Sequence, residues 1–66
     1  MDRNGESKIL RLEKAREVQH RTAFGRTTLW KKVREGEFPK PLNIGNGRIA
    51  WRSDEIDAWI ESRPRA

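Results

Sequence analysis

The chain has 66 residues, of which 38% are charged and 33% hydrophobic, and its formal net charge is +5. A chain of this length forms one small domain and has little room to enclose a catalytic cleft, so we expect no enzyme activity. It has no cysteine and a single histidine, His20, which excludes disulfides and a zinc site and predicts no cofactor.

Targeting signals are also missing from the sequence. No run of about 18 apolar residues could span a membrane, so we expect no membrane partner. Residues 1–8 lack the apolar stretch of a secretory signal. These features predict a cytoplasmic protein.

The first third of the chain predicts a tail followed by a helix. Residues 1–8 are polar and aperiodic, which indicates a flexible tail before a single domain at 9–63, with residues 64–66 as a second tail. Residues 9–12 fit either a brief strand or the lead-in to a helix. Helix-forming residues then run from Glu13 to Thr22. The apolar stripe of this helix consists of Leu12, Ala15, Val18 and Thr22.

A short interruption at residues 23–26 separates this helix from a second one. Gly25 predicts a tight turn, and Phe24 is expected to enter the core. Helical character resumes from 27 to 35, where Gly36 is a natural C-cap and the prolines at 39 and 41 prevent continuation. Its apolar arc holds Leu29, Trp30 and Val33, and the opposite side holds Thr27, Thr28, Lys31 and Arg34.

The last third predicts a hairpin and a third helix. Two short strands within residues 42–51 flank Gly45-Asn46-Gly47, a turn that permits positive φ. Ser53 is the expected N-cap of the third helix, which Pro64 closes. Its buried face is expected to hold Ile56, Trp59 and Ile60. The order helix, turn, helix, hairpin, helix predicts a mainly α winged helix-turn-helix domain.

The charge is unevenly distributed along this order. Residues 1–52 hold 13 Lys/Arg against 6 Asp/Glu, whereas residues 53–62 hold four acidic residues and no basic one. From Arg26 to Arg34 there are four basic residues and no acid. A basic body with one acidic segment suits a polyanion bound on one face, although a solvated surface is the simpler reading of charge alone.

Two segments resemble the AlpA family of small phage and prophage transcriptional regulators, which are related to excisionase and MerR-type winged helices. The first is Glu35-Gly36-Glu37-Phe38-Pro39-Lys40-Pro41, and the second runs from Gly47 to Ile60 and includes Trp51 and Trp59. Residues 22–30 match the family's Thr-Gly-Leu-Ser-Arg-Ser-Thr-Leu-Tyr pattern with several substitutions. The resemblance covers residues 9–62. One departure is Gly25, where the family usually has Ser, so the second helix lacks a side-chain cap.

The resemblance implies sequence-specific binding of double-stranded DNA. The recognition helix, about 27–35, would enter the major groove, and the wing, about 42–51, would contact the adjacent backbone or minor groove. The implied DNA-binding residues are Arg26, Thr27, Thr28, Lys31, Lys32, Arg34, Asn46 and Arg48.

Several of these residues also have a simpler reading. Arg26 could read a guanine or bind only a phosphate, and Thr27 could contact a base or cap its helix. Asn46 could serve only the turn, and Arg48 could be a solvated charge. Trp51 and Trp59 are expected in the core, with Trp30 at its edge.

The transcriptional role has two alternatives. An excisionase that bends DNA for an integrase would have the same fold. A protein-interaction adaptor would use the acidic residues Asp54, Asp57 and Glu61 as its docking surface. Partners of a regulator would be DNA in the nucleoid, RNA polymerase or an integrase, and a second copy as a dimer or in cooperative binding, because one winged helix contacts few base pairs.

Overall fold

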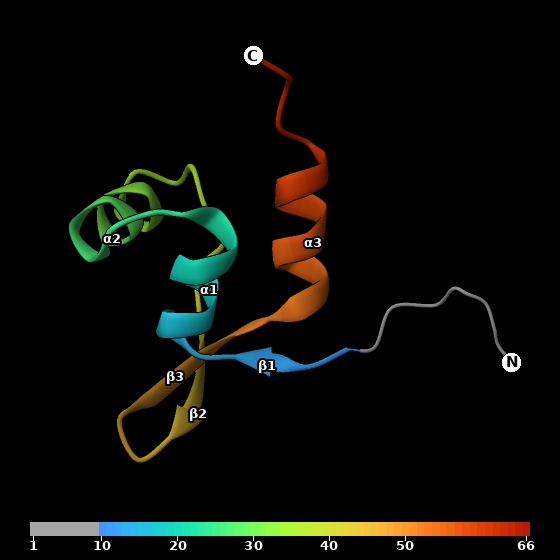
Figure 1. Ribbon diagram of the computed structural model, residues 1–66. Coiled ribbons are helices and arrows are strands. Elements are labelled where there is room, and N and C mark those ends of the chain that lie inside the picture. Colours follow the sequence, from blue (N-terminus) through green and yellow to red (C-terminus); the bar gives the residue numbers. More distant parts are fainter. Residues whose placement is uncertain (1–9) are drawn as a thin grey trace, which may run out of the picture.

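The computed structural model describes residues 10–66 (Figure 1). In chain order its elements are β1 (Leu12–Glu13), α1 (Ala15–Thr22), α2 (Arg26–Arg34), β2 (Leu42–Gly45), β3 (Arg48–Arg52) and α3 (Ser53–Glu61). Three helices and a small antiparallel sheet confirm the predicted fold class. The predicted tail at residues 1–8 lies outside the described residues.

The sheet has three strands in the order β1-β3-β2, and both pairs are antiparallel. Residues 9–12 were predicted as either a brief strand or the lead-in to a helix. The structure has a brief strand, at Leu12–Glu13. The predicted helix start at Glu13 was wrong, because Glu13 pairs with Trp51 of β3. This pairing spans 38 positions of the chain and leaves no trace in local periodicity.

Ser53 ties the start of the described chain to α3. Its backbone N–H donates to the Arg11 carbonyl at 2.8 Å, and its Oγ accepts from the Arg11 N–H at 2.7 Å. The predicted N-cap position is one residue off, because Arg52 occupies it and Ser53 is the first residue of α3. Asp54 and Glu55 lie in the first helical turn, where the helix dipole favours acidic side chains.

The turn between α1 and α2 uses a different residue from the one predicted. Ala23 ends α1 in the left-handed region with φ 63°, whereas Gly25 is extended with φ −73° and is the N-cap of α2. Helix α2 therefore begins at Arg26, one residue before the predicted start, and Gly25 supplies no side-chain cap. At the start of α1, the Lys14 N–H donates to Glu17 Oε1 at 2.8 Å.

Gly36 ends α2 as predicted, just after the C-cap residue Glu35. Its φ is +77°, and its N–H donates to the Val33 carbonyl at 3.1 Å. The next N–H, from Glu37, reaches the Lys32 carbonyl at 2.9 Å. This pair of hydrogen bonds is the Schellman motif, which needs a left-handed residue at this position.

We expect Gly36→Ala to lower the free energy of unfolding by about 1 kcal/mol, because a Cβ strains a left-handed backbone. No heavy atom outside the neighbouring residues lies within 4 Å of the added Cβ, so the cost is conformational. Urea titration followed by circular dichroism measures it. Glu35→Ala is the matched control, since Glu35 is exposed and right-handed. Equal midpoints for the two variants would contradict the assignment.

The core lies between the helices and the inner face of the sheet. Its buried apolar side chains are Val18, Leu29, Val33, Phe38, Ala50, Trp51 and Ile56. Trp51 is fully buried and its Nε1–H donates to the Pro39 carbonyl at 2.7 Å. Trp59 is partly buried and packs edge-on against Phe38 with ring centroids 4.8 Å apart, and Phe24 joins this cluster as expected.

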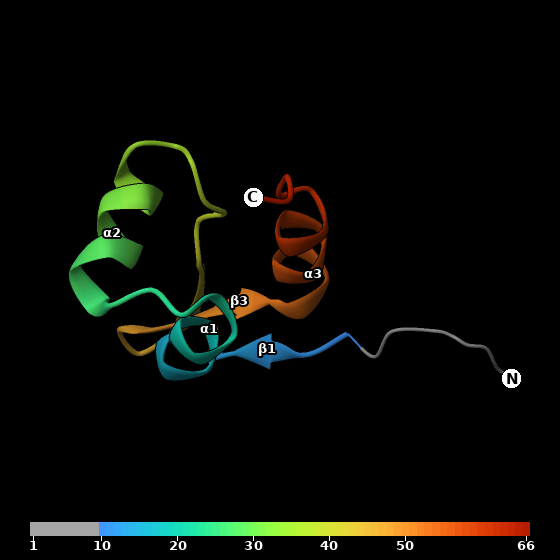
Figure 2. The same cartoon turned by 45° about the horizontal axis from the view of Figure 1, so that its top comes forward.

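Two members of the predicted apolar faces lie outside this core. Leu12 is 53% exposed because it belongs to β1 and not to the first helix, and Ile60 of α3 is 36% exposed. Val18 and Ile56 are fully buried as predicted. Figure 2 shows α1 between α2 and α3, so the two outer helices stand on opposite sides of the domain.

Candidate nucleic-acid interface

The exposed face of α2 carries most of the predicted site. Thr27, Lys31 and Arg34 follow one another at helical spacing i, i+4 and i+7, and Thr28 lies beside them. All four side chains are exposed, and so is Arg26 at the first position of the helix. The opposite face buries Leu29 and Val33, so the core fixes which side of α2 faces outward.

Positive charge on this face is not neutralised within the described chain. Among residues 10–66, the ion pairs involve neither Arg26 nor Lys31 nor Arg34. The first turn of α2 holds no acidic residue, which leaves its partly positive N-terminal end uncompensated by carboxylates. A helix with this face and this charge can approach an anionic backbone without displacing an internal partner.

Lys32 differs from the other predicted residues of α2. Its Nζ lies 3.5 Å from a carboxylate oxygen of Glu37 and 5.5 Å from the centroid of the Phe24 ring. Its side chain is 33% exposed. The structure therefore places Lys32 toward the aromatic cluster and apart from the face that Thr27, Lys31 and Arg34 form.

The wing is the second part of the site. Its tip has three consecutive left-handed residues, Gly45, Asn46 and Gly47, with φ values of 99°, 53° and 72°. The Gly45 N–H donates to Asn43 Oδ1 at 2.9 Å, which stiffens the approach to the tip. Asn46 and Arg48 are both exposed, and Arg48 forms no ion pair with residues 10–66.

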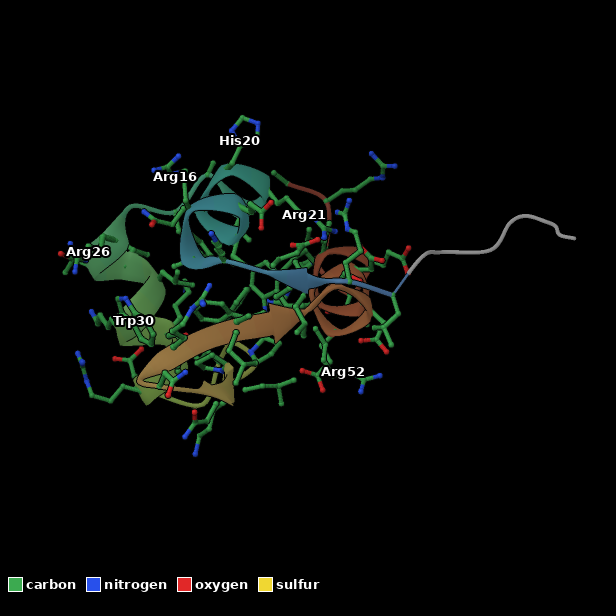
Figure 3. All side chains as sticks on the ribbon, turned by 90° about the horizontal axis from the view of Figure 1, so that it is seen from below. Arg16, His20, Arg21, Arg26, Trp30 and Arg52 are labelled. Atoms are coloured by element: carbon green, nitrogen blue, oxygen red, sulfur yellow. The ribbon has the colours of Figure 1, made fainter. Side chains whose placement is uncertain are left out.

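The fold brings these two parts to the same side of the domain. In both Figure 1 and Figure 2, α2 and the hairpin tip lie on one side and α3 lies on the other. Figure 3 shows Arg26 at this edge and Arg16 of α1 pointing outward. The sequence reasoning missed Arg16, which is exposed, because its position followed only from the packing of α1 against the sheet.

Arg21, by contrast, points into the domain. Its guanidinium bonds Glu13 Oε2 at 2.7 Å and also bonds the Asp57 carboxylate, so it joins α1 to β1 and α3. The hydrogen bond to Asp57 is the main cause that raises the pKa of Arg21. Arg21 is therefore tied into the domain by two carboxylates, whereas His20 of the same helix is exposed.

The acidic residues of α3 are partly neutralised by basic neighbours. Asp57 is bound by Arg21, and Asp54 accepts two hydrogen bonds from Arg52 at 3.0 and 2.9 Å. The pKa of Asp54 is lowered chiefly by this bond to Arg52. An adaptor surface built on Asp54 and Asp57 would have to compete with these arginines.

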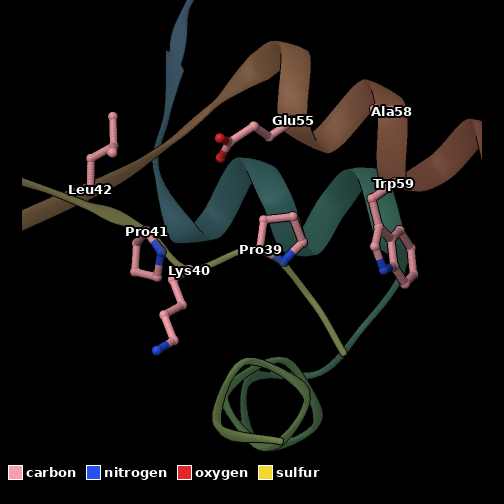
Figure 4. A pocket seen from close by; sticks show the side chains of 7 residues that line it. All are labelled: Pro39, Lys40, Pro41, Leu42, Glu55, Ala58 and Trp59. Carbon is pink, nitrogen blue, oxygen red and sulfur yellow. The ribbon is translucent and has the colours of Figure 1, made fainter. Parts of the chain in front are cut away.

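A shallow groove runs between α3 and the segment that leads into β2 (Figure 4). Its volume is 690 Å³, and its lining residues are Pro39, Lys40, Pro41, Leu42, Glu55, Ala58 and Trp59. Lys40 points out of the groove on the side away from Glu55 in this view. None of the predicted DNA-binding residues lines it.

A membrane-spanning helix and a metal-ligand cluster are both absent from residues 10–66. No helix there has the length and apolar character needed to cross a membrane. The same residues contain no group of three or more histidine or carboxylate side chains placed to hold a metal ion.

Helix, turn and helix followed by a projecting hairpin and a third helix define a small winged helix-turn-helix domain. The model of the family described as "Prophage CP4-57 regulatory protein (AlpA)" matches residues 8–64, and the chain therefore belongs to this family of phage regulatory proteins. It is also similar to uncharacterized protein ORF88 of Enterobacteria phage P4, with 36% identity over 47 residues.

That match covers 71% of this chain and 53% of the phage P4 protein, so the chain spans about half the length of this relative. No solved structure matches the chain. The family match confirms the resemblance that residues 35–41 and 47–60 carry.

Proposed function

We propose that this protein binds double-stranded DNA sequence-specifically and regulates phage or prophage transcription. Helix α2 enters the major groove, and the wing contacts the adjacent backbone or minor groove. The observation that carries the proposal is the exposed face of α2, whose cations have no ion-pair partner among residues 10–66 and lie on the same side as the wing. The family's regulatory description supports the same role.

The residues divide by the kind of contact they can make. Arg26, Thr27 and Thr28 lie in the first turn of α2, the part of a recognition helix that reaches base edges. Lys31 and Arg34 lie further along and face the flanking phosphates. Arg48 and Asn46 extend the contact from the wing. Lys32 contributes less, because Glu37 and Phe24 already hold its ammonium group.

Selection of bound duplexes from a random pool tests the proposal. We expect one enriched sequence and a specific affinity that falls steeply with salt. If Lys31, Arg34 and Arg48 each neutralise a phosphate, the slope of log K against log salt is about −3. Stoichiometry in the same experiment tests for a second copy. No enrichment, or no binding at low salt, would contradict DNA recognition and favour the adaptor.

Arg26→Ala is expected to weaken binding to the selected site by about 1–3 kcal/mol, or about 5- to 150-fold, and to relax preference at one base position. The reason is that an arginine in this turn can donate two hydrogen bonds to a guanine. Electrophoretic mobility shifts on the selected duplex and on single-base variants measure both effects.

Lys32→Ala is the matched control on the same helix. We expect its affinity for any duplex to change less than about twofold, because Lys32 contacts Glu37 and Phe24 within the protein and its removal takes away no DNA contact. If Lys32→Ala weakened binding as much as Arg26→Ala, the assignment of the reading face would be wrong.

A further inference from the structure

The wing is attached to the body of the domain at its base. All four residues of β2 are exposed, and so are Arg48 and Ile49 at the start of β3. Ala50 and Trp51 are the first buried residues of β3. The direction in which the hairpin projects is therefore set where Trp51 enters the core.

Trp51 is fixed there by partners from separate segments. Its indole N–H donates to the Pro39 carbonyl, and its backbone pairs with Glu13 of β1. Its ring lies against Trp30 of α2, with centroids 5.6 Å apart and planes inclined by 48°. This aromatic pair is a direct contact between the recognition helix and the strand that carries the wing.

Trp30 stands in the middle of the proposed binding helix. It is four residues after Arg26 and four before Arg34, so the three lie along one line of the helix surface. Its side chain is partly buried and packs on the core (Figure 3). Through its ring contact with Trp51, Trp30 thus links the middle of α2 to the base of the wing.

We propose that Trp30 is a positioning residue that sets the direction of the wing relative to α2. It fixes the separation between the DNA contacts of Arg26 and those of Arg48, so the protein reads a bipartite site with one allowed spacing. This inference rests on the proposed function for its consequence in binding, but the geometry it describes belongs to the free protein.

A small rotation at the base of the hairpin displaces the tip of the wing by a larger distance. The wing tip at Asn46 is five residues from Trp51, a distance of about 15 Å along an extended strand. A rotation of about 10° at Trp51 therefore moves the tip by about 3 Å, which exceeds the range of a hydrogen bond. A smaller side chain at position 30 removes the surface against which Trp51 rests and permits such a rotation.

Spin-label distances in the free protein test the geometry directly. The chain has no cysteine, so Thr28→Cys and Asn46→Cys give two unique labelling positions on α2 and on the wing tip. We expect one narrow distance distribution with Trp30 present, one about twice as wide with Trp30→Leu, and an intermediate width with Trp30→Phe. Circular dichroism establishes that each variant is folded.

Trp59→Leu is the matched control, because Trp59 is also a partly buried tryptophan but its ring packs against Phe24 and Phe38 and not against Trp51. It should leave the distribution narrow. Equal widths in Trp30→Leu and the parent, or equal broadening in Trp59→Leu, would overturn the proposal whether or not the protein binds DNA.

A double-mutant cycle on the selected duplex then tests the consequence. Arg48→Ala should weaken binding about fivefold in the parent and less than about twofold in Trp30→Leu, whereas Arg26→Ala should cost the same in both. A general loss of stability would reduce both effects alike. If Arg48→Ala weakened binding as much in Trp30→Leu as in the parent, the positioning role would be overturned. A parent protein that binds no duplex would instead contradict the proposed function.

Discussion

Trp51→Ala is expected to lower the free energy of unfolding by about 3–5 kcal/mol, the cost of removing a large aromatic side chain from a core. Trp51 is the largest fully buried side chain, and its loss also leaves the Pro39 carbonyl without its indole donor. A domain of this size has only a few kcal/mol of net stability. The variant should therefore be largely unfolded at 25 °C, as far-ultraviolet circular dichroism will report.

Two comparisons isolate the cause of that loss. Trp51→Phe keeps an aromatic ring and loses the hydrogen bond, so we expect it to fold with a midpoint between the parent and Trp51→Ala. Trp59→Ala should cost less than Trp51→Ala, because Trp59 is only partly buried. A folded Trp51→Ala with the parent midpoint would show that the core does not depend on this side chain.

Arg21→Ala is expected to destabilise the domain by about 2 kcal/mol. Removing one member of a fully buried ion pair lowers the free energy of unfolding by about 3–5 kcal/mol. The Arg21 side chain is 27% exposed, so we expect a smaller loss. Glu13, whose side chain is 2% exposed in the parent and has one oxygen without a hydrogen-bond partner, would keep only the exposed Arg11 beside it. Thermal and urea unfolding curves measure the loss.

The origin of that loss can be checked by a second substitution. If an uncompensated buried carboxylate is responsible, adding Glu13→Gln to Arg21→Ala should recover part of the stability. Arg52→Ala is the control, because Arg52 and Asp54 form an exposed pair and their separation should leave the unfolding midpoint unchanged. No recovery in the double variant would point instead to lost packing of the Arg21 stem.

The pKa of Arg21 also fixes the pH behaviour of this contact. Its pKa is raised by the bond to Asp57, so its charge stabilises the folded state below the ordinary arginine range and the contribution is lost only as pH rises past the raised value. Between neutral and moderately alkaline pH, the difference in stability between the parent and Arg21→Ala should therefore stay constant.

Local patterns in the sequence predicted most of the fold. The second helix, the hairpin and the third helix followed from periodicity, glycines and prolines, and their bounds differ from the structure by a few residues at most. The outward face of α2 was predictable because Leu29 and Val33 define its buried side. Arg26, Lys31 and Arg34 stay predicted DNA contacts, and the structure shows that their side chains are exposed.

Contacts between distant residues were not predictable in this way. Glu13 was predicted as the first residue of a helix because helix-forming residues follow it. Its strand partner, Trp51, lies far along the chain and does not affect that local pattern. The bonds of Arg21 to Glu13 and Asp57 depend on the packing of three elements, so no local pattern predicts them. The tight turn was predicted at Gly25 because glycine favours a left-handed backbone. The left-handed residue is instead Ala23, whose side chain does not favour that conformation.

The pairing of residues 11–13 with residues 51–53 also has a consequence during synthesis. The first strand of the sheet cannot be completed until the residues of β3 and the start of α3 have left the ribosome, because long-range contacts form only after both partners exist. At about 5–20 residues per second, a nascent chain waits a few seconds in that state. A message cut short before residue 51 would yield an α2 without the strand that supports it.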